Sequence, residues 1–169
     1  MIICGLDPGT ATTGYGIIKV EGDSISVIDF GLIETAKGGS ISFRLLDIHE
    51  KLNSILSLHN PDIVAIERLF FATNAKTAIN VGQAQGVMFL SAQMQNKMVV
   101  EYAPGTIKKM VSGSGRADKK EVQKSVRKFL GAKVRSKKHG KTHFDNAADA
   151  LAVALCHAFK NSSLKGGES

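Results

Sequence analysis

Three acidic residues stand beside apolar segments, where a charged side chain is uncommon. Asp7 follows the apolar residues 2–6, Glu67 follows the apolar residues 63–66, and Asp149 lies within an apolar run near the C-terminus. A charge beside a core is costly unless something pairs with it. Because strand ends can converge at one edge of a sheet, we expect these carboxylates to meet. A divalent cation would relieve their repulsion, and hard oxygen ligands suit Mg²⁺ or Mn²⁺.

Such a site has a definite chemistry. Paired cations about 3.5–4 Å apart activate a water molecule and stabilise the leaving oxygen of a phosphodiester. Each acid also has an ordinary structural interpretation: Asp7 in a turn before Pro8, Glu67 at an exposed strand end, and Asp149 as a helix N-cap. The metal interpretation gains from the charge distribution of the chain.

The basic residues are concentrated in one segment. The chain has 22 Lys and Arg against 15 Asp and Glu, a net charge of +7. Residues 108–141 contain 13 basic and two acidic residues, whereas the rest of the chain is net negative. This polarity favours a polyanionic partner, with nucleic acid first, over a merely solvated lysine-rich surface.

Length and composition fit a single compact domain. The 169 residues are 43% hydrophobic and 22% charged, which allows a sizeable core and argues against a disordered chain. No apolar run approaches the ~20 residues of a membrane-spanning helix, and residues 1–7 have no basic region typical of a signal peptide. Cys4 and Cys156 are too few for a disulfide framework, so we expect a reducing cytoplasm and no membrane partner.

The pattern of elements must bring the acids together. We expect strands at residues 2–6, 13–20, 24–33, 63–66 and 98–102, and helices at 41–59, 74–95, 106–111, 119–130 and 145–159. Ser40 is a candidate N-cap for the first helix, which Asn60 and Pro61 end. Gly82 and Gly86 lie on one face of the second helix and permit close helix contact. Three strands followed by alternating helices and strands predict an α/β fold with a mixed sheet.

Several motifs then carry a resemblance to a known family. They are DPGT at 7–10, TGYG at 13–16, AIE at 65–67, NA at 74–75, GQAQG at 82–86 and AADALA at 147–152. Together they resemble the RuvC family, the bacterial Holliday junction resolvases of the RNase H-like superfamily, over residues 2–157. The resemblance implies an RNase H-like mixed five-stranded sheet flanked by helices. It places a single nuclease domain at residues 1–160, before a disordered tail at 161–169.

The resemblance also implies residue roles. Asp7, Glu67 and Asp149 match the metal ligands, while Lys108 and Lys119 match basic positions near the scissile backbone. Phe70 matches the family's aromatic residue that stacks on a junction base. Arg116 and Lys120, two further basic residues of the basic segment, are the remaining DNA-binding candidates. Core packing is the alternative role for Phe70, and general phosphate attraction is the alternative for the lysines.

One position departs from the family pattern. The family usually has a fourth acid three residues before the last Asp, but this chain has Asn146 there, preceded by Asp145. On a helix, Asn146 lies about 60° and Asp145 about 40° from Asp149, on opposite sides. We rank Asn146 first as the remaining catalytic and metal-binding residue, then Asp145, then His143. Asn supplies a carbonyl oxygen without charge and should hold a second cation less tightly.

The resulting hypothesis is a metal-dependent, structure-specific DNA endonuclease that resolves four-way junctions in recombination and repair. The resemblance implies two Mg²⁺ per active site, with Mn²⁺ as a substitute, and paired symmetric cuts by a homodimer. We expect residues 74–95 to form the dimer interface. It also implies a branch-migration helicase complex of RuvA and RuvB as partner.

Two other functions compete with this one. With Asn146 in a ligand position, the protein could grip junctions while cutting weakly or not at all. The DPGT sequence also resembles the first phosphate loop of actin-like kinases. That superfamily needs two such domains and a second acidic-glycine loop, and this chain shows neither.

Overall fold

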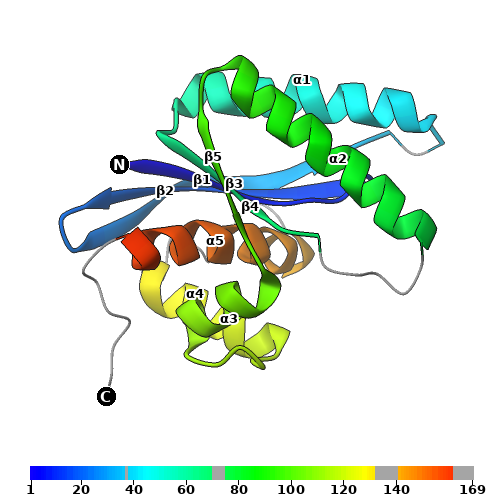
Figure 1. Ribbon diagram of the computed structural model, residues 1–169. Helices are drawn as coiled ribbons and strands as arrows, with labels where there is room; N and C mark the ends of the chain where they lie inside the picture. The colour runs from blue at the N-terminus through cyan, green and yellow to red at the C-terminus, as the bar shows by residue number, and fades with distance from the viewer. Residues whose placement is uncertain (37, 70–74, 132–140, 162–169) are drawn as a thin grey trace.

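The sheet has the mixed topology expected from the sequence. The computed structural model describes residues 1–36, 38–69, 75–131 and 141–161, and only the backbone of residues 141–146. Its sheet has the order β3-β2-β1-β4-β5 (Figure 1). The strands are β1 Ile2–Asp7, β2 Thr12–Glu21, β3 Ser24–Glu34, β4 Ile63–Glu67 and β5 Met98–Tyr102. β1 to β3 form an antiparallel meander, whereas β4 and β5 run parallel to β1.

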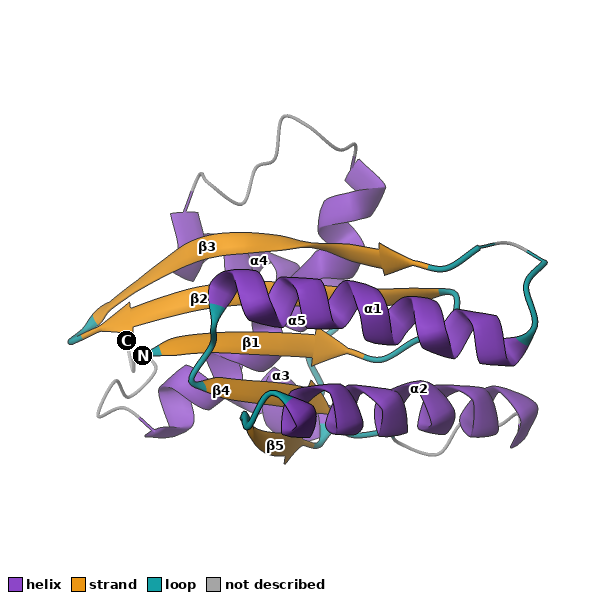
Figure 2. Ribbon diagram, turned by 90° about the horizontal axis from the view of Figure 1, so that it is seen from above, coloured by secondary structure: helices purple, strands orange, loops and turns teal. Residues whose placement is uncertain are grey.

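Helices cover both faces of the sheet. One face carries α1 Ile41–His59 and α2 Ala75–Met94, and the other carries α5 Lys141–Asn161, with α3 Pro104–Ser112 and α4 Lys119–Leu130 packed beyond it (Figures 1 and 2). Each face therefore has its own buried apolar cluster. Among the described residues, no helix has the length and apolar character needed to cross a bilayer.

Local sequence explains most of the helix ends. The Ser40 side chain accepts a hydrogen bond from the Phe43 amide at the start of α1, and Asn60 ends that helix in a left-handed conformation. Asp118 and Glu121 form a reciprocal capping box at the start of α4. The sequence prediction missed the start of α3, which includes Pro104, a residue tolerated in a first turn.

The last helix is longer than predicted. It begins at Lys141 instead of residue 145 and includes Asn161, which was expected to belong to the tail. Residues 162–169 lie outside the described residues. The stretch before Asp149 is rich in charged and polar side chains, so its apolar periodicity is weak and the prediction began too late.

Two glycines bring this helix close to the sheet. A Cβ on Gly5 of β1 would lie 2.1 Å from the Ala150 carbonyl oxygen, and a Cβ on Gly16 of β2 would lie 2.7 Å from Leu151. These distances are too short for any side chain at Gly5, because its closest neighbour is backbone. The close approach sets the height of Asp149 above the end of β1.

Candidate active site

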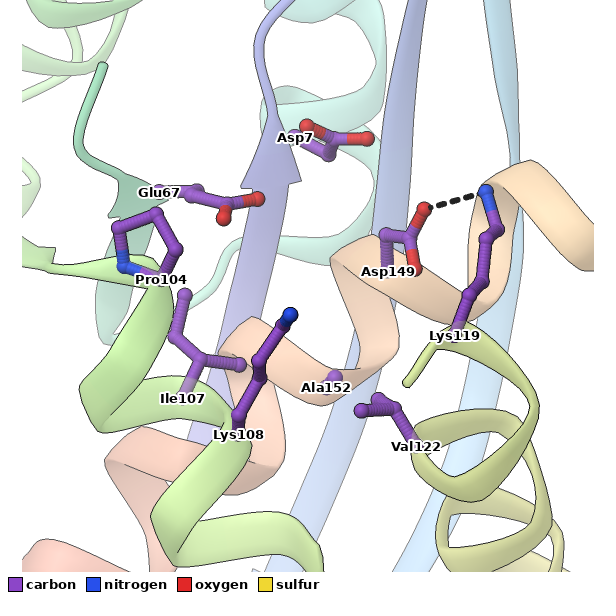
Figure 3. Close-up of a pocket in the computed structure, with 9 residues that line it drawn as sticks. All are labelled: Asp7, Glu67, Pro104, Ile107, Lys108, Lys119, Val122, Asp149 and Ala152. Atoms are coloured by element: carbon purple, nitrogen blue, oxygen red, sulfur yellow. Dashed lines mark hydrogen bonds and ion pairs between the residues drawn. The ribbon is translucent and has the colours of Figure 1, made fainter. Parts of the chain in front are cut away.

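A pocket of about 270 Å³ lies where β1 and β4 end, between α3, α4 and α5 (Figure 3). It contains all three acids singled out from the sequence, together with two lysines and an apolar wall. The lining residues are Asp7, Glu67, Pro104, Ile107, Lys108, Lys119, Val122, Asp149 and Ala152. The structure thus brings together residues separated by as much as 145 positions in the chain.

Strand pairing places the first two acids side by side. Asp7 and Glu67 are the last residues of β1 and β4, and the parallel register pairs Leu6 with Ile66 just before them. Both side chains face the pocket (Figure 3). Two carboxyl groups that share a pocket repel each other when both are ionised, which favours protonation of the pair when no cation is bound.

The pKa values of the pair reflect this crowding. Burial raises the pKa of Asp7 to about 6, and the negative charge of Asp149 adds to the effect, while Lys119 opposes it. Burial also raises the pKa of Glu67 to about 8, followed by repulsion from Asp7 and Asp149, while Lys108 opposes it. The pair therefore holds a proton more tightly than two isolated carboxyl groups would.

Asp149 reaches the same pocket from α5 and has a different partner. The Lys119 ammonium, from the first turn of α4, lies 2.9 Å from Asp149 Oδ2 (Figure 3). Within the described part of the chain, no three His, Cys, Asp or Glu side chains are already arranged as a metal site. A cation shared by all three carboxylates therefore requires these side chains to come closer together than they lie here.

The donor set nevertheless fits a hard divalent cation. Among the described residues that line the pocket, the side chains that can bind a metal are the three carboxylates, and burial followed by repulsion raises the pKa of two of them. A divalent cation relieves that repulsion in the same way as a proton, but with twice the charge. Asp7 and Glu67 would hold it first, with Asp149 as the adjustable third ligand.

The other predicted site residues fall into three groups. Lys108 and Lys119 line the pocket. Arg116 and Lys120 are exposed near the start of α4 and are not among the lining residues. Phe70 and the side chains of the three candidates for the fourth ligand lie outside the described residues: His143, Asp145 and Asn146.

The sequence prediction missed one residue that shapes this site. Gly5 lies two residues before Asp7 and lets α5 approach β1, which brings Asp149 over the strand end. A glycine inside a short apolar strand is itself a signal, because it weakens the strand and often marks a close backbone approach. That signal was present in the sequence and predicts a contact, although it does not identify the partner.

Comparison with known proteins points to one family of nucleases. A family model described as crossover junction endodeoxyribonuclease RuvC matches residues 3–157. The chain is 47% identical over 165 residues to a crossover junction endodeoxyribonuclease RuvC of Caldicellulosiruptor saccharolyticus, covering 97% of this chain and 96% of that protein.

Two solved structures have the same architecture. The chain is similar to Thermus thermophilus RuvC, with a TM-score of 0.81, 32% identity and 94% of both chains covered. It is also similar to T. thermophilus RuvC in complex with Holliday junction substrate, with a TM-score of 0.84, 32% identity, and 95% and 94% of the two chains covered. The predicted RNase H-like fold, a mixed five-stranded sheet flanked by helices, is confirmed.

Proposed function

Because the chain belongs to the RuvC family of crossover junction endodeoxyribonucleases, we propose that it resolves four-way DNA junctions by metal-dependent phosphodiester hydrolysis. The observation that carries this proposal is the pocket in which Asp7, Glu67 and Asp149 meet beside Lys108 and Lys119. It combines carboxylates that need a metal cation with lysine side chains that attract a phosphate.

The residues of the pocket divide the work. Divalent cations bound by the acids would neutralise their charge and would activate water for in-line attack on phosphorus. Asp7 and Glu67 would hold these cations as carboxylates, so a proton held by the pair has to leave when the cations bind. Lys119 and Lys108 face the same space and stabilise the phosphate and its developing charge.

The finer details of the site are proposals that rest on the family. We propose two Mg²⁺ per active site, with Mn²⁺ able to replace them. Asn146 is our first choice for the remaining ligand, and Asp145 is the second. Phe70, Arg116 and Lys120 are proposed to contact the junction, with Phe70 stacking on a base and the two cations binding its phosphates.

Paired symmetric cuts need two active sites, so we propose a homodimer that packs through α2. Three large apolar side chains of this helix are exposed, namely Ile79 (62%), Leu90 (58%) and Met94 (62%). A Cβ on Gly86 would have no atom of another element within 4 Å among the residues that the structure describes, which leaves room for a second copy. A RuvA and RuvB partner complex remains a prediction from the family. A reducing compartment such as the cytoplasm is proposed because both cysteines are buried free thiols.

The decisive experiment is cleavage of an end-labelled four-way junction with Mg²⁺ present. Asp7→Asn should bind the junction as the unchanged protein does, yet cut it at least ~1000-fold more slowly, because it cannot bind cations as a carboxylate. Asp29→Asn is the matched control. Asp29 is also a half-buried acid at the sheet, but it contacts Tyr15 and His59 on the α1 side.

Two outcomes would contradict the proposal. If Asp7→Asn cleaved the junction at the same rate as the unchanged protein, the pocket would not be the catalytic site. A gel shift with the junction but no cleavage in Mg²⁺ or Mn²⁺ would favour the alternative of a junction-binding protein. The ion pair between Lys119 and Asp149 is the observation that keeps this alternative open.

A further inference from the structure

A buried amide lies directly beneath the catalytic strand end, on the face of the sheet opposite the pocket. Gln85 belongs to α2 and is only 8% exposed. It is part of the GQAQG motif, which contributed to the family resemblance and whose glycines predicted helix contact, but for which the sequence assigned no role to the glutamines. Buried amides need hydrogen-bond partners, so the partners of Gln85 show what it holds in place.

Gln85 donates both of its observed hydrogen bonds to the ends of two neighbouring strands. Its Nε2 lies 2.9 Å from Glu101 Oε1 of β5 and 3.4 Å from the backbone carbonyl oxygen of Glu67 in β4. The bond to Glu101 is charge-assisted and therefore the stronger of the two. One side chain thus links α2, β5 and the peptide group of a predicted metal ligand.

The same carboxylate also holds the residue after Glu67. Arg68 Nε lies 3.9 Å from Glu101 Oε1, and the Arg68 amide donates a 2.8 Å hydrogen bond to the Tyr102 carbonyl oxygen. The chain leaves β4 at this point, because the strand pairing of the described residues ends at Glu67 and Tyr102. Gln85 and Glu101 therefore hold the last peptide of the strand from below.

We infer that Gln85 is a positioning residue, which orients the Glu67 backbone from the α2 face so that the Glu67 carboxyl group stays beside Asp7. This inference rests on the proposed function, since it assigns Gln85 to the same metal-dependent site. Side chains alternate along a strand, so a rotation of the Glu67 peptide moves its carboxyl group on the far face. A residue that never touches substrate can in this way alter how tightly a cation is held.

The same contacts connect the site with the proposed dimer helix. Gln85 lies on the buried side of α2, and the next residue, Gly86, is exposed about 100° further round the helix. A small shift of α2 on pairing with a second copy would reach Glu67 through a single side chain. Among the hydrogen bonds between described residues, no other one from an α2 side chain to a catalytic residue is recorded.

The test compares Gln85→Met with Gln95→Met. Methionine keeps the length of glutamine and removes its donors. Gln95 lies just after α2 and donates hydrogen bonds to the Asn53 carbonyl oxygen (3.0 Å) and to Asn53 Oδ1 (3.1 Å). Its replacement removes comparable contacts between helices without touching Glu67, so it controls for a purely structural role.

Three readouts separate positioning from folding. Mn²⁺ binding to the DNA-free protein, measured by electron paramagnetic resonance, should weaken about tenfold in Gln85→Met and less than about twofold in Gln95→Met. The Mg²⁺ concentration for half-maximal junction cleavage should rise by a similar factor, and saturating Mg²⁺ should restore most of the rate. Thermal unfolding midpoints should fall to a similar extent in both variants.

Two results would overturn the inference: unchanged Mn²⁺ binding in Gln85→Met, or equal weakening in both variants. If Gln85→Met does not fold, Glu101→Gln tests the same link, because it removes the charge that holds Gln85 and Arg68. Weaker Mn²⁺ binding is expected there too. An unchanged protein that binds Mn²⁺ but cuts no junction would refute the proposed function, and the Mn²⁺ data would still decide the role of Gln85.

Discussion

The helices on the two faces of the sheet carry contrasting side chains. α4 has six charged residues among its 12, five of them basic, whereas Lys76 is the one charged residue among the 20 of α2. The exposed side of α2 presents Ile79, Leu90 and Met94 instead. Figure 1 shows α2 above the sheet and α4 below it, so the contrast divides the molecule into two sides.

This contrast indicates separate tasks for the two sides. The α3, α4 and α5 side combines carboxylates with lysines at a strand end, which is costly for folding and useful for phosphate chemistry. The α1 and α2 side is suited to packing, against the sheet and, as we propose, against a second copy. Gln85 connects the two sides, because this α2 residue donates a hydrogen bond to the backbone of Glu67.

The largest expected effect is a glycine substitution made on each side. Gly5→Ala should destabilise the protein by about 3 kcal/mol, because its Cβ collides with the backbone of α5, and cleavage should fall as Asp149 is displaced. The Cβ of Gly86→Ala meets no atom of another described element within 4 Å, so dilute protein should gain about 0.5–1 kcal/mol from helix propensity. Urea unfolding measures both, and equal losses in the two variants would erase the distinction between the two sides.

The next effect concerns two lysine–aspartate pairs of similar length. Lys119 lies 2.9 Å from Asp149 in the pocket, and Lys51 lies 2.7 Å from Asp47 on α1. Lys119→Met should slow junction cleavage about 30-fold through lost charge stabilisation, whereas Lys51→Met should leave the rate within about twofold. Single-turnover cleavage rates measure both variants. A comparable loss of rate in Lys51→Met would show that the effect does not depend on a positive charge inside the pocket.

The smallest effect is the pH dependence of stability without metal. Asp7 and Glu67 have folded-state pKa values raised to about 6 and about 8, so the folded protein binds more protons than the unfolded chain between about pH 4 and pH 8. Stability should therefore fall as the pH rises through that window, because the folded state loses protons that the unfolded chain has already released.

Denaturant unfolding in EDTA at pH 5.5 and pH 8 measures this change. Added Mg²⁺ should restore stability at pH 8, because the cation neutralises the two carboxylates. Asp7→Asn should flatten the metal-free pH dependence, since it removes one carboxylate of the pair. A metal-free protein that becomes more stable as the pH rises would contradict the raised pKa of the two acids.

Local signals in the sequence were sufficient for most elements and for the three acids. The polar cap at Ser40, the stop at Asn60 and the apolar run before Glu67 each act within a few residues, so their consequences are readable from the chain. The start of α5 was missed because its first turns lack an apolar stripe. The fourth ligand, Asn146 or Asp145, stays a prediction.

The sequence by itself determined which residues can do chemistry: acids that end apolar segments, a basic segment for a polyanion, and motifs that resemble one family. Tertiary structure alone decided which of them meet. It paired Asp149 with Lys119 and not with Lys120, and it packed α5 against Gly5. It also brought the Gln85 side chain to the Glu67 carbonyl oxygen from the α2 face of the sheet. Side-chain type and local periodicity depend on neighbours in the chain, whereas these contacts depend on how distant elements pack, to within about an ångström.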